Sequence, residues 1–183
     1  MNEKIHIVVE GSEDLLFLKG YFGFLGISFS DRCFKNLGGW NNLDGYMPTV
    51  KEKLDKGVNV LIIFDANADR KARVKEINHA LGNISLPVFL FPNGKSEGNL
   101  EDLLMEIIAP ENEDVFICFD DYKKCLKERN PNYIHPDKKG KIYAYKEAIG
   151  ALQNRADQFD SKYWNYDHPA LNPLKKFLTE NIG

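Results

Sequence analysis

The segment that most constrains this chain is residues 58–64, which read VNVLIIF and are followed by Asp65. Apart from Asn59, its residues are apolar on both sides of the two-residue strand period. A strand of this kind is buried on both faces and is typical of the centre of a parallel sheet that helices cover on each side. The segment therefore predicts an α/β fold.

The flanking sequence repeats this pattern of strand and helix. Besides residues 58–64, short apolar runs predict strands at 4–9, 32–37 and 86–91. Helical spacing of apolar residues predicts helices at 42–56, 71–81 and 100–108, and one that ends near residue 25 with Ser12 as its N-cap. We expect a Rossmann-like, parallel four-stranded sheet with helices on both faces, in which chemistry gathers at the carboxyl ends of the strands.

The chain changes character after Pro110. Residues 114–129 and 142–152 predict two helices, the polar residues 130–141 predict a loop between them, and Pro173 opens a last short helix. No nuclease or primase motif stands out in this part. We expect residues 1–110 to form the α/β domain and residues 111–183 to form a helical extension packed on that same domain.

Composition excludes several classes of protein. The 183 residues carry 24 Lys and Arg against 27 Asp and Glu, a net charge of −3, whereas proteins that grip duplex nucleic acid through many phosphates are usually basic. Any nucleic-acid contact is therefore expected through a local patch. The chain has no run of about 20 apolar residues, no apolar N-terminal leader and no CxxC pair. These features predict a cytoplasmic protein without a membrane partner, and they leave the oligomeric state open.

Acidic residues follow the segments predicted as strands. Glu10 and Asp14 come after the first strand, Asp65 and Asp69 after the third, and the pair at 101–102 after the loop that closes the fourth. Oxygen ligands of this kind suit Mg²⁺ or Mn²⁺. Carboxylates that converge at one sheet edge repel one another unless a cation neutralises them. The pattern therefore predicts a divalent-metal site at this edge.

Four motifs, in order, resemble those of Toprim domains. They are VVEGSEDLLFL at residues 8–18, GGW at 38–40, LIIFDAN at 61–67 and GNLEDLL at 98–104. The last is similar to the corresponding segment of the overcoming-lysogenization-defect (OLD) nucleases and of small stand-alone relatives. The resemblance covers about residues 3–110, and it implies a Toprim-like sheet with a Mg²⁺ site at its edge.

The resemblance also implies a function and residue roles. Glu10 would be a metal ligand and a general acid or base, and Asp65 would hold metal together with the residue at position 67. Asp14 and Glu101 would complete a two-metal arrangement for phosphodiester cleavage. The chain is then expected to process nucleic acid or another phosphoester, as a nuclease does.

One position departs from the family pattern. The second acid of the family's DxD motif is replaced by Asn67, a neutral and weaker ligand. Asp69 would substitute for it if the chain stays extended from Asp65, because strand alternation keeps these positions on one side. Without such a substitute, the chain is expected to be a non-catalytic binding or regulatory module of the same fold.

Basic residues and glycines near these motifs are candidates for nucleic-acid contact. Arg70 and Lys71 stand, with Arg73 and Lys75, in the densest basic run, just after the Asp65 turn, and reach a backbone phosphate unless the run only covers a solvated helix face. Gly38 and Gly39 form the glycine step of the second motif. Lys95, on a glycine-bounded loop, is a candidate catalytic residue that faces phosphate, and the alternative is an idle surface lysine.

Two other interpretations of the Asp65 segment are weaker. A phosphatase with Asp65 as its nucleophile would need a second acid at position 67. The acids from Asp65 to Glu76 also match the ligand spacing of an EF-hand, but Arg70 stands where that loop requires glycine. A strand, not a helix, precedes the segment, which further disfavours an EF-hand.

Overall fold

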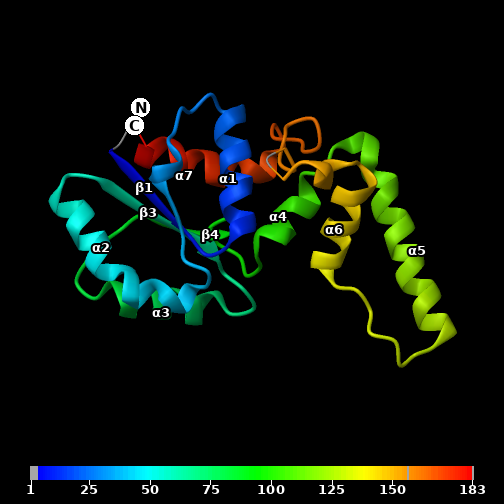
Figure 1. Ribbon diagram of the computed structural model, residues 1–183. Coiled ribbons are helices and arrows are strands. Elements are labelled where there is room, and N and C mark those ends of the chain that lie inside the picture. The colour runs from blue at the N-terminus through cyan, green and yellow to red at the C-terminus, as the bar shows by residue number, and fades with distance from the viewer. Residues whose placement is uncertain (1–3, 156, 183) are drawn as a thin grey trace.

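The centre of the protein is a parallel sheet (Figure 1). The computed structural model describes residues 4–155 and 157–182, and within them four strands form this sheet in the order β2-β1-β3-β4. The strands are β1 (Ile5–Val9), β2 (Phe34–Asn36), β3 (Asn59–Asp65) and β4 (Val88–Phe91). Val9 is opposite Ile63, and Asp65 is opposite Phe91. The carboxyl ends of the strands therefore lie at one edge, and the predicted fold class is confirmed.

The strands form because their residues are apolar on both faces, and the two faces pack into separate clusters. Alternate residues along the strands join one cluster under the helices α1 (Ser12–Phe24), α4 (Leu100–Glu106) and α7 (Asn172–Ile182), namely Ile5, Ile7, Val9, Leu61, Ile63, Phe89 and Phe91. The intervening residues join the other cluster under α2 (Leu43–Asp55) and α3 (Arg70–Leu81), namely Val8, Val60, Ile62, Phe64 and Leu90. The period of two thus fixes which helices cover each face.

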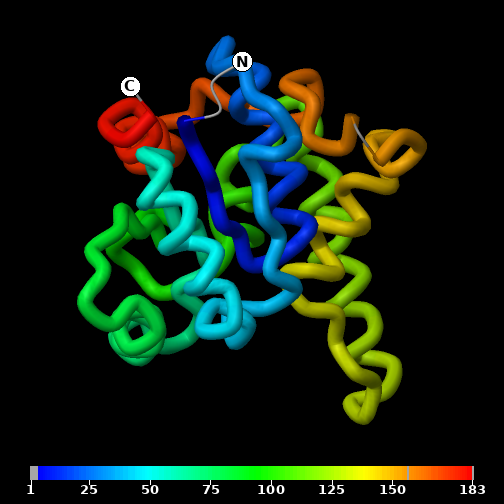
Figure 2. The backbone as a smooth tube through the Cα atoms, turned by 60° about the vertical axis from the view of Figure 1, so that its left-hand side comes forward, coloured from blue at the N-terminus to red at the C-terminus, as the bar shows by residue number. Residues whose placement is uncertain are grey.

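The helices that cover the sheet follow the alternation expected from the sequence. They are α1 (Ser12–Phe24), α2 (Leu43–Asp55), α3 (Arg70–Leu81), α4 (Leu100–Glu106) and the C-terminal α7 (Asn172–Ile182). Figure 2 shows α7, in red, beside the start of β1, in dark blue. Short 3₁₀ turns at Asp31–Cys33, Trp40–Asn42, Pro110–Asn112, Ala151–Gln153 and Pro169–Leu171 complete the described elements.

Residues after Pro110 form a helical hairpin and an aromatic tail. Helices α5 (Glu113–Arg129) and α6 (Lys138–Ala148) make the hairpin, whose tip points away from the sheet in Figure 1. The tail places Trp164 and Tyr166 in the same apolar cluster as the sheet residues Val9 and Ile63. The extension therefore shares a core with the sheet. Among the helices of the described residues, none is long and apolar enough to cross a membrane.

The expected boundaries of α1 and α6 are wrong. The N-cap of α1 is Gly11 and not Ser12, because the Asp14 carboxylate accepts a hydrogen bond from the Gly11 N–H at 2.8 Å and starts the helix one residue earlier. Helix α6 spans Lys138–Ala148 and not residues 142–152. It starts early because the Asp137 side chain caps it at the Gly140 N–H, and it ends early, ahead of the left-handed Gly150.

Candidate functional site

Glu10 and Asp65 lie beside each other because they end neighbouring strands. Glu10 directly follows β1, Asp65 is the last residue of β3, and β1 and β3 pair in parallel. The Glu10 atom Oε2 is buried and has no hydrogen-bond partner among the described residues. Burial raises the pKa of Glu10, and the nearby Arg73 guanidinium opposes that shift. Glu10 is thus a half-buried acid with one buried oxygen that has no hydrogen-bond partner in the described part of the chain.

Asp14 joins Glu10 through the tight turn after β1. It stands in the first turn of α1, is 5% exposed, and is fixed by its hydrogen bond from Gly11. Burial raises the pKa of Asp14 to about 6; the Gly11 hydrogen bond opposes this shift, and the charges of Glu10 and Glu101 add to it. The local sequence EGSED therefore folds so that two acids four residues apart face the same region.

Asp65 is the most strongly perturbed acid of this region. Burial is the main cause that raises its pKa to about 8, followed by the repulsion of Asp14. Its Oδ1 accepts a hydrogen bond from the backbone N–H of Leu100 at 2.9 Å, which favours the charged form. The negative charges of Glu10 and Glu101 add to the repulsion. Asp65 therefore carries a proton near neutral pH unless a cation compensates its charge.

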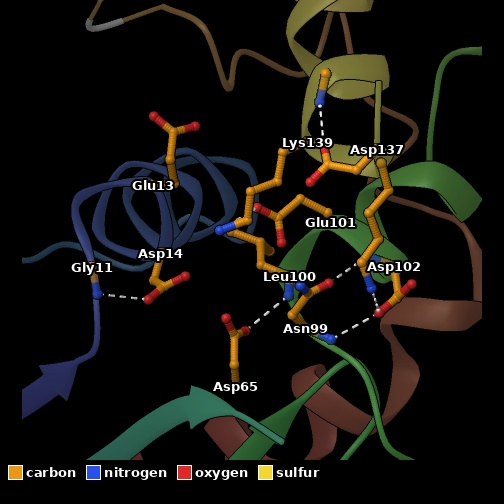
Figure 3. A network of polar contacts seen from close by, with 12 residues as sticks. Gly11, Glu13, Asp14, Asp65, Asn99, Leu100, Glu101, Asp102, Asp137 and Lys139 are labelled. Atoms are coloured by element: carbon orange, nitrogen blue, oxygen red, sulfur yellow. Dashed lines mark hydrogen bonds and ion pairs between the residues drawn. The ribbon is translucent and has the colours of Figure 1, made fainter. Parts of the chain in front are cut away.

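Glu101 completes the group from a third element. It lies in the first turn of α4, and Figure 3 shows Asp14, Asp65 and Glu101 around one region, with Lys139 of α6 close to Glu101. The Lys139 Nζ lies 3.6 Å from Glu101 Oε1. We refer to Glu10, Asp14, Asp65 and Glu101 as the carboxylate cluster. The fold thus brings Glu10 and Glu101, which are more than 80 positions apart in the sequence, to the same sheet edge.

The donor set of the carboxylate cluster fits a hard divalent cation. Every ligand it offers is a carboxylate oxygen, the donor that Mg²⁺ and Mn²⁺ prefer. The orphaned Oε2 of Glu10 and the raised pKa values of Asp14 and Asp65 are features that a cation would relieve. Within the described part of the chain, no three Asp, Glu, His or Cys side chains already stand as a ready-made cage. Mg²⁺ commonly needs one or two carboxylates and keeps several waters.

Asn67 and Asp69 do not extend the strand beyond Asp65. Asn67 has a φ of 56°, in the left-handed region. Its backbone exchanges two hydrogen bonds with Gly98, at 2.6 and 2.8 Å. The chain therefore does not stay extended to Asp69, as substitution for Asn67 would require. The Asp69 carboxylate instead caps α3 by accepting a hydrogen bond from the Ala72 N–H at 2.9 Å.

Among the described residues, no hydrogen bond or ion pair joins the Lys95 side chain to the carboxylate cluster. Lys95 is exposed on a turn in which the Asn93 side chain accepts hydrogen bonds from the N–H groups of Lys95 and Ser96. For the described acids Glu10, Asp14 and Asp65, Lys95 is not among the main charges that shift the pKa.

Of the basic and glycine candidates, Arg70 and Lys71 lie on α3, whereas the two glycines lie next to Glu10. Arg70 donates a hydrogen bond to the Gly94 carbonyl at 2.8 Å and so ties α3 to the loop after β4, while Lys71 is exposed. Gly38 and Gly39 have φ values of 70° and 133°, which favour glycine. The Gly39 N–H donates to the Glu10 carbonyl at 3.0 Å, so the glycine step lies directly beside the carboxylate cluster.

Sequence reasoning missed two sets of residues near the cluster. Arg73 is buried on α3, and its guanidinium lies over the Trp40 ring, 4.5 Å from the centroid. The signal for it is helical spacing, because Arg73 shares the buried stripe of Ile77 and Leu81. The second set is on α6, where Lys138 contacts Asp102 at 2.5 Å next to the Lys139 pair. No local pattern identifies a contact between residues so distant in sequence.

Comparison with known proteins adds one match. A family model described as "Protein of unknown function (DUF3226)" matches residues 4–182. No curated protein and no solved structure matches the chain. The match spans the sheet, the carboxylate cluster and the helical extension.

Proposed function

The chain belongs to the DUF3226 family, and we propose that it is a Toprim-type protein that binds Mg²⁺ or Mn²⁺ and acts on phosphoesters, as a nuclease does. The proposal rests on one observation above all. Four carboxylates from three separate parts of the chain lie near one another at the carboxyl edge of a parallel sheet, although burial and, after it, their mutual repulsion raise the pKa values of Asp14 and Asp65. An arrangement that costs stability in the folded protein is typical of a functional site.

The residues of the cluster have distinct parts in this proposal. Asp65 would hold a divalent ion, with its orientation fixed by the Leu100 N–H. Glu10 would be both a ligand, through its free Oε2, and the group that transfers a proton. Asp14 and Glu101 would complete a second metal position. When bound, two such ions activate water and stabilise the leaving oxygen of a phosphodiester.

The substrate is proposed to reach the cluster from the side of the glycine step and α3. A chain with a net charge of −3 attracts nucleic acid only through a local patch. Gly39 adjoins the cluster through its hydrogen bond to the Glu10 carbonyl, and glycines allow a phosphate backbone to approach closely. Lys71, exposed on α3, and Lys95, exposed on the loop after β4, are proposed to contribute general positive charge.

A second candidate function is a non-catalytic binding or regulatory module. One observation favours it: Asn67 is neutral, is exposed, and has its backbone engaged with Gly98. The acid that would replace it, Asp69, is occupied as a helix cap. In this alternative the cluster still binds a metal ion, but no phosphodiester is cut.

Metal binding and cleavage, measured separately, distinguish the two functions. Mn²⁺ binding by calorimetry should be detectable for wild type and weakened in Asp65→Asn. Wild type should nick supercoiled plasmid or cut single-stranded DNA with Mn²⁺, and Glu10→Gln should remove the activity. Cleavage that persists unchanged in Glu10→Gln would rule out the nuclease proposal. Metal binding without any cleavage would favour the binding module, and no metal binding at all would end both.

A further inference from the structure

Arg73 is a buried cation whose hydrogen-bonding capacity is largely unused. Its side chain is 7% exposed, yet Nε and Nη1 have no hydrogen-bond partner in the described ranges 4–155 and 157–182. Its contacts are the Trp40 ring, 4.5 Å from the guanidinium, and Glu76, whose Oε2 lies 3.5 Å from Nη1. An arginine is always charged and carries five N–H donors, so burying them unpaired is unfavourable.

The contacts with Trp40 and Glu76 do not account for this burial. Stacking on Trp40 uses the face of the guanidinium and leaves its edge, where the N–H groups point, without a partner. Glu76 is 40% exposed and sits one helical turn along α3, where such pairs contribute little. A side chain that serves only packing would be better replaced here by an apolar residue.

A matching acceptor without a partner lies in the carboxylate cluster. The Glu10 Oε2 is buried and, in the part of the chain that the structure describes, receives no hydrogen bond. Arg73 is the main charge that acts on Glu10, so the two groups are neighbours, but they are not hydrogen-bonded to each other. One ligand can satisfy both groups. Its oxygen atoms would accept hydrogen bonds from Arg73, and a bound cation would link it to the Glu10 carboxylate.

Phosphate is the ligand chemistry that fits this pair. The planar fork of a guanidinium matches two phosphate oxygens, and its contacts are charge-assisted. An oxyanion near four carboxylates is repelled unless a fixed positive charge faces it. On the α6 side, Lys139 pairs with Glu101 at 3.6 Å and is otherwise exposed, whereas on the α3 side Arg73 has two buried nitrogens without a hydrogen-bond partner among the described residues. The guanidinium lies over the ring of Trp40, the residue that follows the glycine step.

We propose that Arg73, held on Trp40, is the phosphate-binding residue of the carboxylate cluster and contacts the non-bridging oxygens of a phosphoester. The metal ion in this assignment comes from the proposed function, whereas the role of Arg73 rests on the contacts of the arginine itself. Arg70 and Lys71, the residues that the sequence suggested for this role, differ from it. Arg70 is tied to Gly94, and Lys71 is exposed, while the positive charge of Arg73 acts on Glu10.

The test compares Arg73→Gln with Lys75→Gln, which removes an exposed positive charge from the same helix. Calorimetry measures Mn²⁺ alone, then inorganic phosphate with Mn²⁺ present, then a short single-stranded oligonucleotide. Arg73→Gln should keep Mn²⁺ binding and lose about tenfold or more in phosphate affinity, the effect expected of a hydrogen bond to a charged group. Lys75→Gln should bind phosphate as wild type does. If Arg73→Gln does not fold, Arg73→Lys keeps the charge but removes the fork, and it should still weaken phosphate several-fold.

The outcomes separate this inference from the proposed function. Phosphate binding that is equal in wild type and both Arg73 variants would overturn the subsite, as would wild type that takes Mn²⁺ but no phosphate or oligonucleotide. Phosphate binding that depends on Arg73 without any Mn²⁺ binding would support the subsite and overturn the metal-dependent function. If oligonucleotide binding depends on Arg73 and is tighter than the binding of inorganic phosphate, the ligand of the subsite is nucleic acid. If inorganic phosphate binds more tightly, the ligand is a small phosphoester.

Discussion

The Asp65 carboxylate accepts a hydrogen bond from the backbone N–H of Leu100 at 2.9 Å, and this bond joins the end of β3 to the first residue of α4. The first N–H groups of a helix have no partner within it, so an acid placed there is stabilised by the bond and by the helix dipole. The same contact sets the position of Glu101, the next residue along α4. One hydrogen bond thus holds two members of the carboxylate cluster in fixed relation.

Asp65→Asn is expected to stabilise the protein when no divalent metal is present. The amide keeps an oxygen that accepts the Leu100 N–H, and it removes an acid that in the folded protein must either take up a proton or keep a charge that Asp14, Glu10 and Glu101 repel. The free energy of unfolding in EDTA at neutral pH should rise by about 1–3 kcal/mol. Urea unfolding followed by circular dichroism measures it. A loss of stability in EDTA would contradict the electrostatic cost that we assign to this acid.

Stability without metal should fall as pH rises above 6.5. Asp65 has a pKa raised to about 8 by burial and Asp14 one raised to about 6, so the unfolded chain binds fewer protons than the folded one over this range. The stability that these two acids contribute is fully present below the ordinary Asp pKa, and it is lost as the pH rises through about 6 for Asp14 and about 8 for Asp65. The slope should approach, at most, about 1.4 kcal/mol per pH unit near neutrality.

His6 acts in the opposite direction and restricts the measurement to the higher pH range. Burial lowers its pKa to about 4, so its contribution is lost as pH falls below the ordinary value of 6.5. Urea midpoints between pH 6.5 and about 8 therefore report the acids and not the histidine. Asp65→Asn should flatten this slope, and an unchanged slope would show that Asp65 is not its source.

Two glycines of α1 should respond to alanine with opposite signs. A Cβ at Gly20 would lie 2.3 Å from the Phe159 carbonyl oxygen and 2.9 Å from the Tyr166 hydroxyl, so Gly20→Ala should cost about 2–3 kcal/mol. Apart from the backbone of α1 itself and the adjoining residues, no described atom lies within 4 Å of a Cβ at Gly23, where alanine should add up to about 1 kcal/mol of helix stability. The same unfolding assay compares them, and equal effects would mean that the aromatic tail does not pack against α1.

Asn67→Asp is expected to strengthen metal binding if the side chain reaches the carboxylate cluster. The left-handed backbone at this position suits Asp nearly as well as Asn, so the fold should be kept. Mn²⁺ affinity should rise several-fold by calorimetry, and Mn²⁺-dependent nicking should rise with it if the site is a weakened catalyst. Tighter metal binding without any cleavage, in this variant as in wild type, would support the binding module.

Patterns local to the strands predicted most of the fold and part of the site. The apolar run 58–64 identified β3, and the acids after β1 and β3 identified the sheet edge, because parallel strands end together. Asp69 was expected to share a side with Asp65, and no pattern revealed the left-handed turn at Asn67 that prevents it. Backbone torsions of single residues depend on distant partners, here Gly98, which a linear reading does not supply.

Contacts between remote segments explain what the sequence could not show. Lys138 and Lys139 reach Asp102 and Glu101 across 36 and 38 residues, and they stood in a segment predicted as loop. Arg73 belonged to a run that reads as a charged outer helix face, although its helical phase with Ile77 pointed inward. Such residues are recognised only when the packing of α3 and α6 is known.

The backbone at Asn67 also has a meaning for the history of this site. Asn and Asp are the residues, glycine aside, that most readily occupy left-handed torsions, and their codons differ by a single base. The turn between β3 and α3 would accommodate either residue without a change elsewhere in the chain. A lineage that carries this fold can therefore gain or lose a negative charge at the sheet edge in one mutational step, and its chemistry can be switched by selection while its architecture stays intact.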